Sequence, residues 1–291
     1  MAETPVAPDL LAPVIACIEG RLPAPVALMQ LASAAPDAEA IDSSLREASR
    51  HASGSGIKPL EELHALRLRA ADKLERMRDI VSVARRAHSG EHDWARTFDE
   101  AARISPEASV ALYSLGEPEL LQRQTEELVS RMAEWGLLQD EFQVLDFGCG
   151  IGRIATAIAP RVAGVVGVDI SPEMVRLARE RTASLGNIAI AEASAGTLGT
   201  FADASFDAVF AIDSVPYVVA SGLAEFCFRD TARVLKPDGL LLIMNYSYRG
   251  DLSLDRAELQ HLVDRYGFDI ERNGTSDLSL WDGCAFLLRK R

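Results

Sequence analysis

The sequence is short of cysteine and of basic residues, and each shortage excludes a class of protein. Its four cysteines share no short spacing that would form a zinc site or a disulfide-rich scaffold. Thirty basic residues stand against 43 acidic ones, so the net charge is −13. A chain with this charge repels nucleic-acid phosphates unless its cations gather on one face. We therefore predict free thiols, no metal site and no nucleic-acid partner.

The sequence also lacks a hydrophobic run long enough to cross a bilayer. The apolar stretch from Leu10 to Ile18 is too short and contains Pro13, and acids stand where a targeting leader carries basic residues. We therefore predict no membrane partner and a cytoplasmic location. With 291 residues, of which 48% are hydrophobic, the chain is long enough for one large domain and a smaller one.

A glycine-rich turn is the most informative feature that is present. Residues 144–153 read Val-Leu-Asp-Phe-Gly-Cys-Gly-Ile-Gly-Arg, a short apolar strand followed by a turn in which the backbone can approach a ligand closely. A second strand, residues 165–169, ends in Asp169. An acid at this place can accept two hydrogen bonds from a ribose diol, each worth roughly 1.5–3 kcal/mol. The two strands together predict a nucleoside site.

The spacing of the glycines decides between nucleosides. A dinucleotide fingerprint needs a small residue where this chain has Arg153, whose long side chain would hinder close helix packing and the approach of a pyrophosphate. The glycines follow a Gly-x-Gly-x-Gly pattern instead, with Asp146 two residues before the first. This segment resembles motif I of the class I S-adenosylmethionine-dependent methyltransferases. The resemblance implies S-adenosylmethionine as cofactor and S-adenosylhomocysteine as product.

Further landmarks of that family follow in the expected order. Residues 205–213 resemble the entry into the fourth strand, and residues 232–244 resemble a turn and a buried fifth strand. Residues 267–271 and 284–288 are similar to the two closing strands. The resemblance covers about residues 120–291. It implies an α/β fold, a Rossmann-like methyltransferase sheet that is mostly parallel with an antiparallel edge hairpin, plus an N-terminal helical region.

The N-terminal region, residues 1–90, contains no strand-like run. Apolar residues at helical spacing predict four helices, over residues 10–18, from Pro23, over 38–48 and over 59–87. The apolar face of the long fourth helix can pack on the catalytic domain or on a second copy of the chain, and periodicity does not choose between them. A homodimer through these helices is therefore one of two open interpretations.

We predict a methyltransferase domain over residues 91–291, in which residues 91–118 form a lid. In many family members the residues before the first strand cover cofactor and substrate. Tyr113 is the lid aromatic that the resemblance favours, although an aromatic residue packed beneath a helix is the commoner outcome. A helix is expected over residues 118–135.

The resemblance assigns the cofactor to the ends of four strands. The expected cofactor-binding residues are Asp146, Gly148, Cys149, Gly150, Asp169, Ile170, Met174, Ser194, Ala195 and Asp213. At the third strand the sequence departs from the family, because Ser194 or Ala195 stands where many relatives carry an acid for the adenine amino group. Glu192 could replace that acid if the loop is shifted. Cys149 is read as a small residue of the turn rather than as a nucleophile, and Asp169 could alternatively cap the next helix.

No catalytic base is predicted. The sulfonium is already an activated methyl donor, and holding the acceptor in line can supply ~7–11 kcal/mol, against a factor of ~10²–10⁴ from a general base. Tyr217 and Tyr246 follow the fourth and fifth strands at the edge where ligands bind in open α/β sheets, so with Tyr113 they are the substrate-pocket candidates. His261 is expected on the surface of a helix.

The resemblance favours a metal-independent methyltransferase with a small-molecule acceptor. The chain has neither the Asn-Pro-Pro-Tyr tetrad after the fourth strand nor the Asp-Asn pair that holds magnesium in catechol methyltransferases. Two alternatives remain open. One is methylation of a protein or carrier-bound substrate that docks on the N-terminal helices, and the other is a regulator that binds the cofactor without transferring methyl.

Overall fold

The computed structural model describes residues 6–88, 93–193 and 198–291. The chain divides into two compact units: the first comprises residues 1–89, 100–124 and 278–282, and the second comprises residues 90–99, 125–277 and 283–291. The predicted lid segment, residues 91–118, is thus shared between both units. Its role as a lid, and the boundary at residue 90, stay predictions.

The described residues of the first unit form helices and turns, without a strand. Its helices are α1 (Pro8–Ile18), α2 (Ala24–Ala34), α3 (Ala38–His51), η1 (Gly54–Gly56), α4 (Ile57–Arg69), α5 (Leu74–His88), α7 (Pro106–Val110) and η2 (Leu112–Ser114). The helices expected over residues 10–18, from Pro23 and over 38–48 are confirmed. Their apolar faces meet in one core, which includes Val14, Leu28, Leu31, Ile41, Leu45, Leu63, Met77 and Leu115.

The single helix expected over residues 59–87 is wrong, because the chain turns between α4 and α5. Ala70 ends α4 with φ −91° and ψ 7°, and it is completely buried. Lys73 then forms an ion pair with Glu117, which holds the turn against a distant segment. The residues of the turn are good helix formers, so local propensity favours continuity. Packing of Ala70 and the Lys73 ion pair override it.

The second unit is built on a sheet of seven strands. These are β1 (Gln143–Phe147), β2 (Gly164–Asp169), β3 (Ile188–Glu192), β4 (Phe206–Ile212), β5 (Leu235–Met244), β6 (Phe268–Thr275) and β7 (Ala285–Lys290). Their order is β3-β2-β1-β4-β5-β7-β6. Strands β1 to β5 are parallel, and β7 pairs antiparallel with both β5 and β6. The predicted Rossmann-like sheet with an antiparallel edge hairpin is confirmed.

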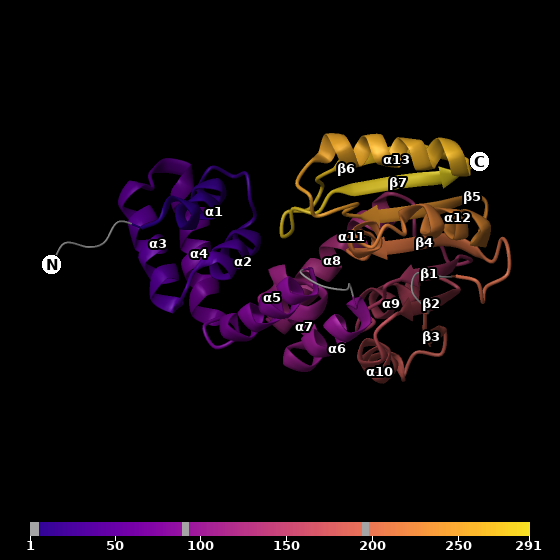
Figure 1. Ribbon diagram of the computed structural model, residues 1–291, viewed down its shortest axis with the longest axis horizontal. Coiled ribbons are helices and arrows are strands. Elements are labelled where there is room, and N and C mark those ends of the chain that lie inside the picture. The colour runs from indigo at the N-terminus through magenta and orange to yellow at the C-terminus, as the bar shows by residue number, and fades with distance from the viewer. Residues whose placement is uncertain (1–5, 89–92, 194–197) are drawn as a thin grey trace. The chain divides into compact units, whose positions relative to one another are not determined.

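Helices flank this sheet, and Figure 1 shows α13 running along β6 and β7. The helices of this unit are α9 (Arg153–Ile158), η3 (Ala159–Arg161), α10 (Pro172–Thr182), α11 (Val215–Ala220), α12 (Ala224–Val234) and α13 (Leu252–Tyr266). Two helices, α6 (Trp94–Ile104) and α8 (Pro118–Glu134), have residues in both units. His261 lies exposed on α13, as expected.

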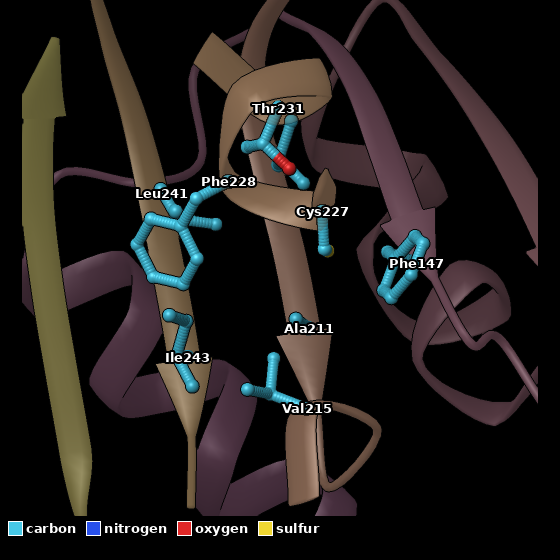
Figure 2. Close-up of a pocket in the computed structure, with 9 residues that line it drawn as sticks. Phe147, Ala211, Val215, Cys227, Phe228, Thr231, Leu241 and Ile243 are labelled. Atoms are coloured by element: carbon cyan, nitrogen blue, oxygen red, sulfur yellow. The ribbon is translucent and has the colours of Figure 1, made fainter. Parts of the chain in front are cut away.

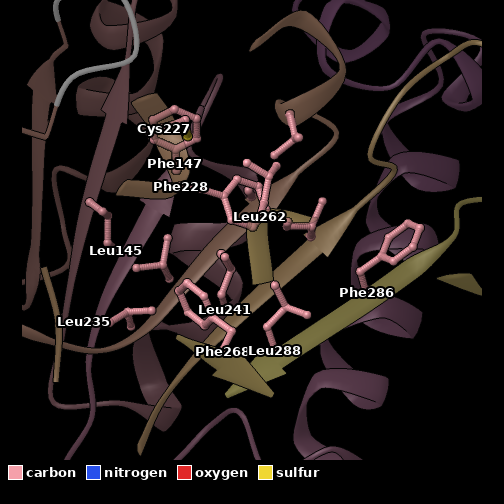
Figure 3. Close-up of a cluster of buried hydrophobic side chains, with 14 of the residues drawn as sticks. Leu145, Phe147, Cys227, Phe228, Leu235, Leu241, Leu262, Phe268, Phe286 and Leu288 are labelled. Carbon is pink, nitrogen blue, oxygen red and sulfur yellow. The ribbon is translucent and has the colours of Figure 1, made fainter. Parts of the chain in front are cut away.

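The central strands are buried on both faces, as in doubly wound sheets. One face packs Leu145 of β1 and Leu241 of β5 against Phe228 of α12 and Leu262 of α13 (Figure 3). Alternate residues such as Val144 are equally buried on the other side. This double burial leaves the carboxyl ends of the strands as the edge at which a ligand can bind. Among the described residues, no helix combines the length and apolarity that a bilayer crossing requires.

Candidate active site

The glycine turn after β1 is tied directly to the end of β2. The N–H groups of Gly148 and Cys149 both donate to the carbonyl oxygen of Val168, at 2.8 and 2.9 Å. Gly148, Gly150 and Gly152 have φ angles of 74°, 53° and 74°, in the left-handed region that side chains disfavour. The three glycines therefore permit a loop that other residues would strain.

Gly148 also allows two strand ends to approach each other. A Cβ atom at Gly148 would lie 2.5 Å from Cβ of Ser214, the second residue after β4. The Ser214 hydroxyl donates to the carbonyl oxygen of Phe147 at 2.7 Å, which holds the two ends together. At Gly152 an added Cβ would lie 3.2 Å from Cβ of Ala178 on α10. The glycine turn thus sits between the segments that follow β2 and β4.

Asp169 closes β2 with its carboxylate directed at the glycine turn. Its Oδ2 accepts the Gly150 N–H at 2.8 Å, and its Oδ1 accepts the Ser171 N–H at 3.0 Å. Burial raises the pKa of Asp169, while these two backbone N–H groups and that of Ile170 lower it. A carboxylate has about four lone-pair sites, so these backbone donors leave at least one for a ribose hydroxyl. The helix α10 is capped by Ser171 rather than by Asp169.

Asp146 is the most deeply buried carboxyl group of the site. It is 1% exposed, and its Oδ2 has no hydrogen-bond partner. The pKa of Asp146 is raised from 3.8 to about 7, because burial and the nearby Asp169 charge raise it by more than Arg153 and the Ala155 N–H lower it. An unpaired buried acceptor is costly, so a ligand that supplies a cation or a donor there is stabilised. Arg153 itself is buried and donates to Thr125 at 3.1 Å.

Three further predicted cofactor residues differ in exposure. Cys149 is 5% exposed, and its sulfur packs against the backbone of Gly167. A Cβ atom added at Gly167 would lie only 3.0 Å from Cys149 Sγ. Burial raises the pKa of Cys149, which fits a packing residue rather than a nucleophile. Met174 is 1% exposed on α10, whereas Ile170 is half-buried next to Asp169. Ile170 therefore has the more accessible apolar surface.

The third strand ends next to Asp169, but the residues that were predicted to contact adenine lie further on. Glu192 pairs in register with Asp169 and is exposed. Ala193 donates its N–H to the Asp169 carbonyl oxygen at 2.8 Å. Ser194 and Ala195, the two residues expected to contact adenine, lie outside the described residues.

The end of β4 brings together Asp213 and two tyrosines. Asp213 Oδ1 accepts hydrogen bonds from the Tyr248 hydroxyl at 2.6 Å and from Asn245 Nδ2 at 3.0 Å. The ring of Tyr217 lies 5.7 Å from that of Tyr248. The sequence prediction named Tyr246, rather than Tyr248, from the segment that follows the fifth strand. The sequence feature that could have identified Tyr248 is its place after the fifth strand, two residues beyond Tyr246.

Tyr246 and Tyr113, the other two predicted pocket residues, are both buried. Tyr246 is 2% exposed within the core, with its ring 6.4 Å from that of Phe286. Tyr113 is buried in the first unit, where its ring stacks on Trp281 at 4.7 Å and 12°. Tyr246 is therefore part of the hydrophobic core. Their roles as pocket residues stay predictions.

Residues 94–99 of α6 contact the site within the second unit. Trp94 donates its indole N–H to Ser221 Oγ at 2.9 Å, after α11. Asp99 Oδ1 accepts the Ser171 hydroxyl at 2.5 Å and the Glu173 N–H at 3.0 Å, at the start of α10. This segment is therefore attached to the helices that follow β2 and β4. No sequence pattern signals the Asp99 contact, because its partners are more than seventy residues away.

A small apolar cavity lies in the core beneath α12, and its lining includes Phe147, the residue before the glycine turn. Figure 2 shows Cys227, Phe228 and Thr231 of α12 facing the strand residues Leu241 and Ile243. Its volume of about 10 Å³ holds no more than a water molecule. The described residues also contain no group of three or more His, Cys, Asp or Glu that could hold a metal ion.

Comparison with known proteins identifies the central part of the chain. Residues 145–243 match the family model of a methyltransferase domain. A 2-methyl-6-phytyl-1,4-hydroquinone methyltransferase of Synechocystis is 30% identical over 149 residues, which are 48% of this chain and 46% of that protein. A demethylmenaquinone methyltransferase of Tropheryma whipplei is 39% identical over 106 residues, 36% of this chain and 42% of that protein. The chain thus spans about half the length of the curated relatives it matches.

A solved structure shares the fold. A Pyrococcus horikoshii protein superposes with a TM-score of 0.51 and 22% identity, over 66% of this chain and 99% of that one. The sheet order, the glycine turn and the acid that closes β2 define a Rossmann-like methyltransferase domain. Residues 145–243 thus match a methyltransferase domain, and the fold is similar to that of the class I S-adenosylmethionine-dependent methyltransferases.

Proposed function

We propose that this chain transfers the methyl group of S-adenosylmethionine to a small-molecule acceptor without the help of a metal ion. The observation that carries the proposal is the arrangement of Asp169, whose carboxylate is held on the glycine turn by the Gly150 N–H. The two relatives named above are themselves named for small molecules, a hydroquinone and a demethylmenaquinone. They support a small acceptor for this chain.

The residues of the site fit the cofactor. The backbone of Gly148–Gly150 would hold the methionine part, and the Asp169 carboxylate, where the backbone leaves it open, would accept hydrogen bonds from the ribose. The unpaired Oδ2 of Asp146 provides a negative charge for the cationic end of the cofactor. When bound, the sulfonium supplies an activated methyl group. The residues of the chain then need to bind and orient the acceptor and to exclude water.

Replacing Asp169 by alanine tests the cofactor site. We expect the wild type to bind S-adenosylhomocysteine with micromolar affinity and the variant to lose about 10- to 10⁴-fold, because one or two charged hydrogen bonds to the ribose are removed. Calorimetric titration measures both, with NAD as the competing nucleotide. Asp264→Ala is the matched control, since Asp264 is exposed on α13. Equal affinity in Asp169→Ala, or binding of NAD alone, would contradict the proposal.

Metal independence has its own test. Asp213, at the end of β4, accepts hydrogen bonds from the Asn245 amide and the Tyr248 hydroxyl. These partners are hydrogen-bond donors, not the further carboxylates that would complete a metal site. We therefore expect methyl transfer to continue at an unchanged rate after treatment with a chelator, measured as formation of S-adenosylhomocysteine. A rate that chelation abolishes and magnesium restores would show that the acceptor is held by a metal.

The oligomeric state and the wider role of the first unit stay proposals. Three large apolar side chains of this unit are exposed, Ile15 at 43%, Ile57 at 48% and Leu68 at 77%. These residues are where a second copy of the chain or a protein substrate would make apolar contacts.

A further inference from the structure

Asp99 of α6 is bound to the first residues of α10, directly after the strand that ends in Asp169. Its Oδ1 atom accepts the Ser171 hydroxyl at 2.5 Å and the Glu173 N–H at 3.0 Å. Asp99 is half-buried and Ser171 is completely buried, so the bond between them is partly shielded from water. A carboxylate from a segment more than seventy residues earlier in the chain is thereby fixed close to Asp169.

Ser171 passes this attachment on to Asp169. The Ser171 N–H donates to Asp169 Oδ1 at 3.0 Å, and the Gly150 N–H donates to Asp169 Oδ2 at 2.8 Å. Because its hydroxyl and its N–H are both bonded, Ser171 cannot shift without disturbing the Asp169 carboxylate. The position of the carboxylate that faces the glycine turn therefore depends on Asp99.

The bond from Ser171 to Asp99 is additional to the cap of α10. Ser171 already caps this helix, since its side-chain oxygen accepts the Met174 N–H at 3.1 Å and its carbonyl oxygen accepts the Val175 N–H at 3.0 Å. The hydroxyl proton of Ser171 takes no part in that cap, and it is this proton that binds Asp99. Asp99 thus holds the residue that caps the helix and bonds to Asp169.

The other end of the same segment is anchored after β4. The Trp94 indole N–H donates to Ser221 Oγ at 2.9 Å, and Trp94 is 5% exposed. The rings of Trp94 and Phe98 pack edge-on against the ring of Tyr217 on α11, each with centroids 4.9 Å apart. Trp94 and Phe98 are one helical turn apart and therefore lie on one face of α6. These contacts restrain Asp99, which is the next residue.

The two anchors place residues 94–99 across the carboxyl end of β1. Trp94 and Asp99 are five residues apart, which is about 7.5 Å along a helix. Strands β2 and β4 are the two neighbours of β1, so their ends are about 9.5 Å apart, twice the spacing of paired strands. Since the two lengths are similar, the segment reaches from the end of β2 to the end of β4. It therefore crosses the strand that carries the glycine turn.

We propose that Asp99 is a positioning residue for the cofactor, which holds the Asp169 carboxylate through Ser171 in the orientation that accepts hydrogen bonds from the ribose. Asp99 acts through these two residues rather than by contact with the cofactor. This inference rests on the proposed function, because Asp169 must bind the ribose for Asp99 to change the affinity. The positioning group comes from the segment before β1, outside residues 145–243, which match the methyltransferase domain.

The contribution of Asp99 is its acceptor oxygen rather than its charge. Burial and the Asp99 charge raise the pKa of Asp169, whereas the backbone N–H groups around the carboxylate lower it. The Asp99 charge therefore works against the Asp169 carboxylate. Asp99→Asn removes the charge and keeps an oxygen that can accept the Ser171 hydroxyl, so it should retain the affinity that Asp99→Ala loses.

Calorimetric titration with S-adenosylhomocysteine tests the role of Asp99. We expect Asp99→Ala to weaken binding by about three- to tenfold, the effect of one hydrogen bond, and Asp99→Asn to stay within about twofold of the wild type. Ser171→Ala removes the other partner of the same bond and should show the loss as well, which keeps the test available if Asp99→Ala does not fold.

Asp251→Ala is the matched control for a lost helix cap. Asp251 caps a different helix, α13, by accepting the Leu254 N–H at 3.0 Å. This variant should bind S-adenosylhomocysteine like the wild type, and denaturant unfolding compares the stability of all variants. Wild-type affinity in both Asp99→Ala and Ser171→Ala, or an equal loss in Asp251→Ala, would overturn the inference.

A double-mutant cycle tests the route of the effect. If Asp99 acts through Asp169, Asp99→Ala should cost no further affinity once Asp169→Ala is present, as measured by ligand-detected NMR, which follows weak binding. The 2′,3′-dideoxy analogue of S-adenosylhomocysteine, which lacks the ribose hydroxyls, should bind to Asp99→Ala and to the wild type equally. A merely structural role would weaken both ligands alike.

The outcomes separate the inference from the proposed function. Additive losses in the cycle, or an equal loss for the dideoxy analogue, overturn the role of Asp99 and leave the proposed function intact. If S-adenosylhomocysteine does not bind to the wild type at all, the proposed function fails, and the role of Asp99 fails with it.

Discussion

Gly148→Ala should lose both stability and cofactor binding. The new Cβ would lie 2.5 Å from Cβ of Ser214, which is itself held by its bond to the Phe147 carbonyl. The φ of 74° adds a cost of roughly 1–2 kcal/mol for any side chain, and overpacking adds typically 1–3 kcal/mol. The ends of β1 and β4 must therefore separate, and the turn that faces the cofactor changes shape.

Gly222→Ala separates the two causes. Gly222 has nearly the same φ, 71°, but an added Cβ there would meet no atom within 4 Å. We expect it to show only the conformational cost and to bind S-adenosylhomocysteine like the wild type. Denaturant unfolding measures stability, and calorimetry measures binding. If Gly148→Ala binds the cofactor as well as Gly222→Ala does, the contact with Ser214 is not what shapes the turn.

The sequence predicted the parts of the site that depend on local chemistry. The three glycines need their left-handed φ angles whatever surrounds them, so the turn after β1 could be located from the pattern alone. The acid that closes β2 and the buried runs of β4 and β5 likewise follow from short segments. Together these segments fix the order of a doubly wound sheet and the edge at which it binds ligands.

The choice between Tyr246 and Tyr248 shows where pattern reasoning stops. Alternation along a strand assumes extended backbone, but Asn245 has a φ of 60° directly after β5. The chain turns there, so Tyr246 enters the core and Tyr248 meets Asp213. The turn is maintained by bonds from Asn245 to Cys284 and Asp213, which lie more than thirty residues away. Such contacts leave no trace in a local pattern.

The same limit applies to the first unit. Its core joins Val14 and Leu45 to Leu115 and Leu120, so the helices expected as a separate N-terminal region share a core with later residues. A truncation before residue 57 would therefore remove part of that core as well as any docking surface. Substitution of an exposed residue such as Leu68 is the cleaner way to separate docking from folding.

Asp146→Asn should change how stability depends on pH. The pKa of Asp146 is about 7 in the folded protein, whereas its ordinary value, which applies to the unfolded chain, is 3.8. A raised folded pKa means that stability is fully present below pH 3.8 and is lost as the pH rises through 7. A rise of about three pH units, at about 1.4 kcal/mol each, corresponds to a loss on the order of 4 kcal/mol. The asparagine variant should lack this loss, most of which falls between pH 5 and pH 8, where denaturant unfolding measures it.

The same carboxyl group should couple cofactor binding to proton release. A cation bound beside the unpaired Oδ2 of Asp146 favours the carboxylate, so binding below pH 7 must expel a proton. The affinity for S-adenosylhomocysteine should then rise from pH 5.5 to pH 7.5, by at most about tenfold per pH unit. Calorimetry in two buffers of different ionisation enthalpy counts the released protons. Asp169 also has a raised pKa, and Asp146→Asn separates the two, because any slope that remains in that variant belongs to Asp169. An affinity that is independent of pH in the wild type would mean that the cationic end of the cofactor lies away from Asp146.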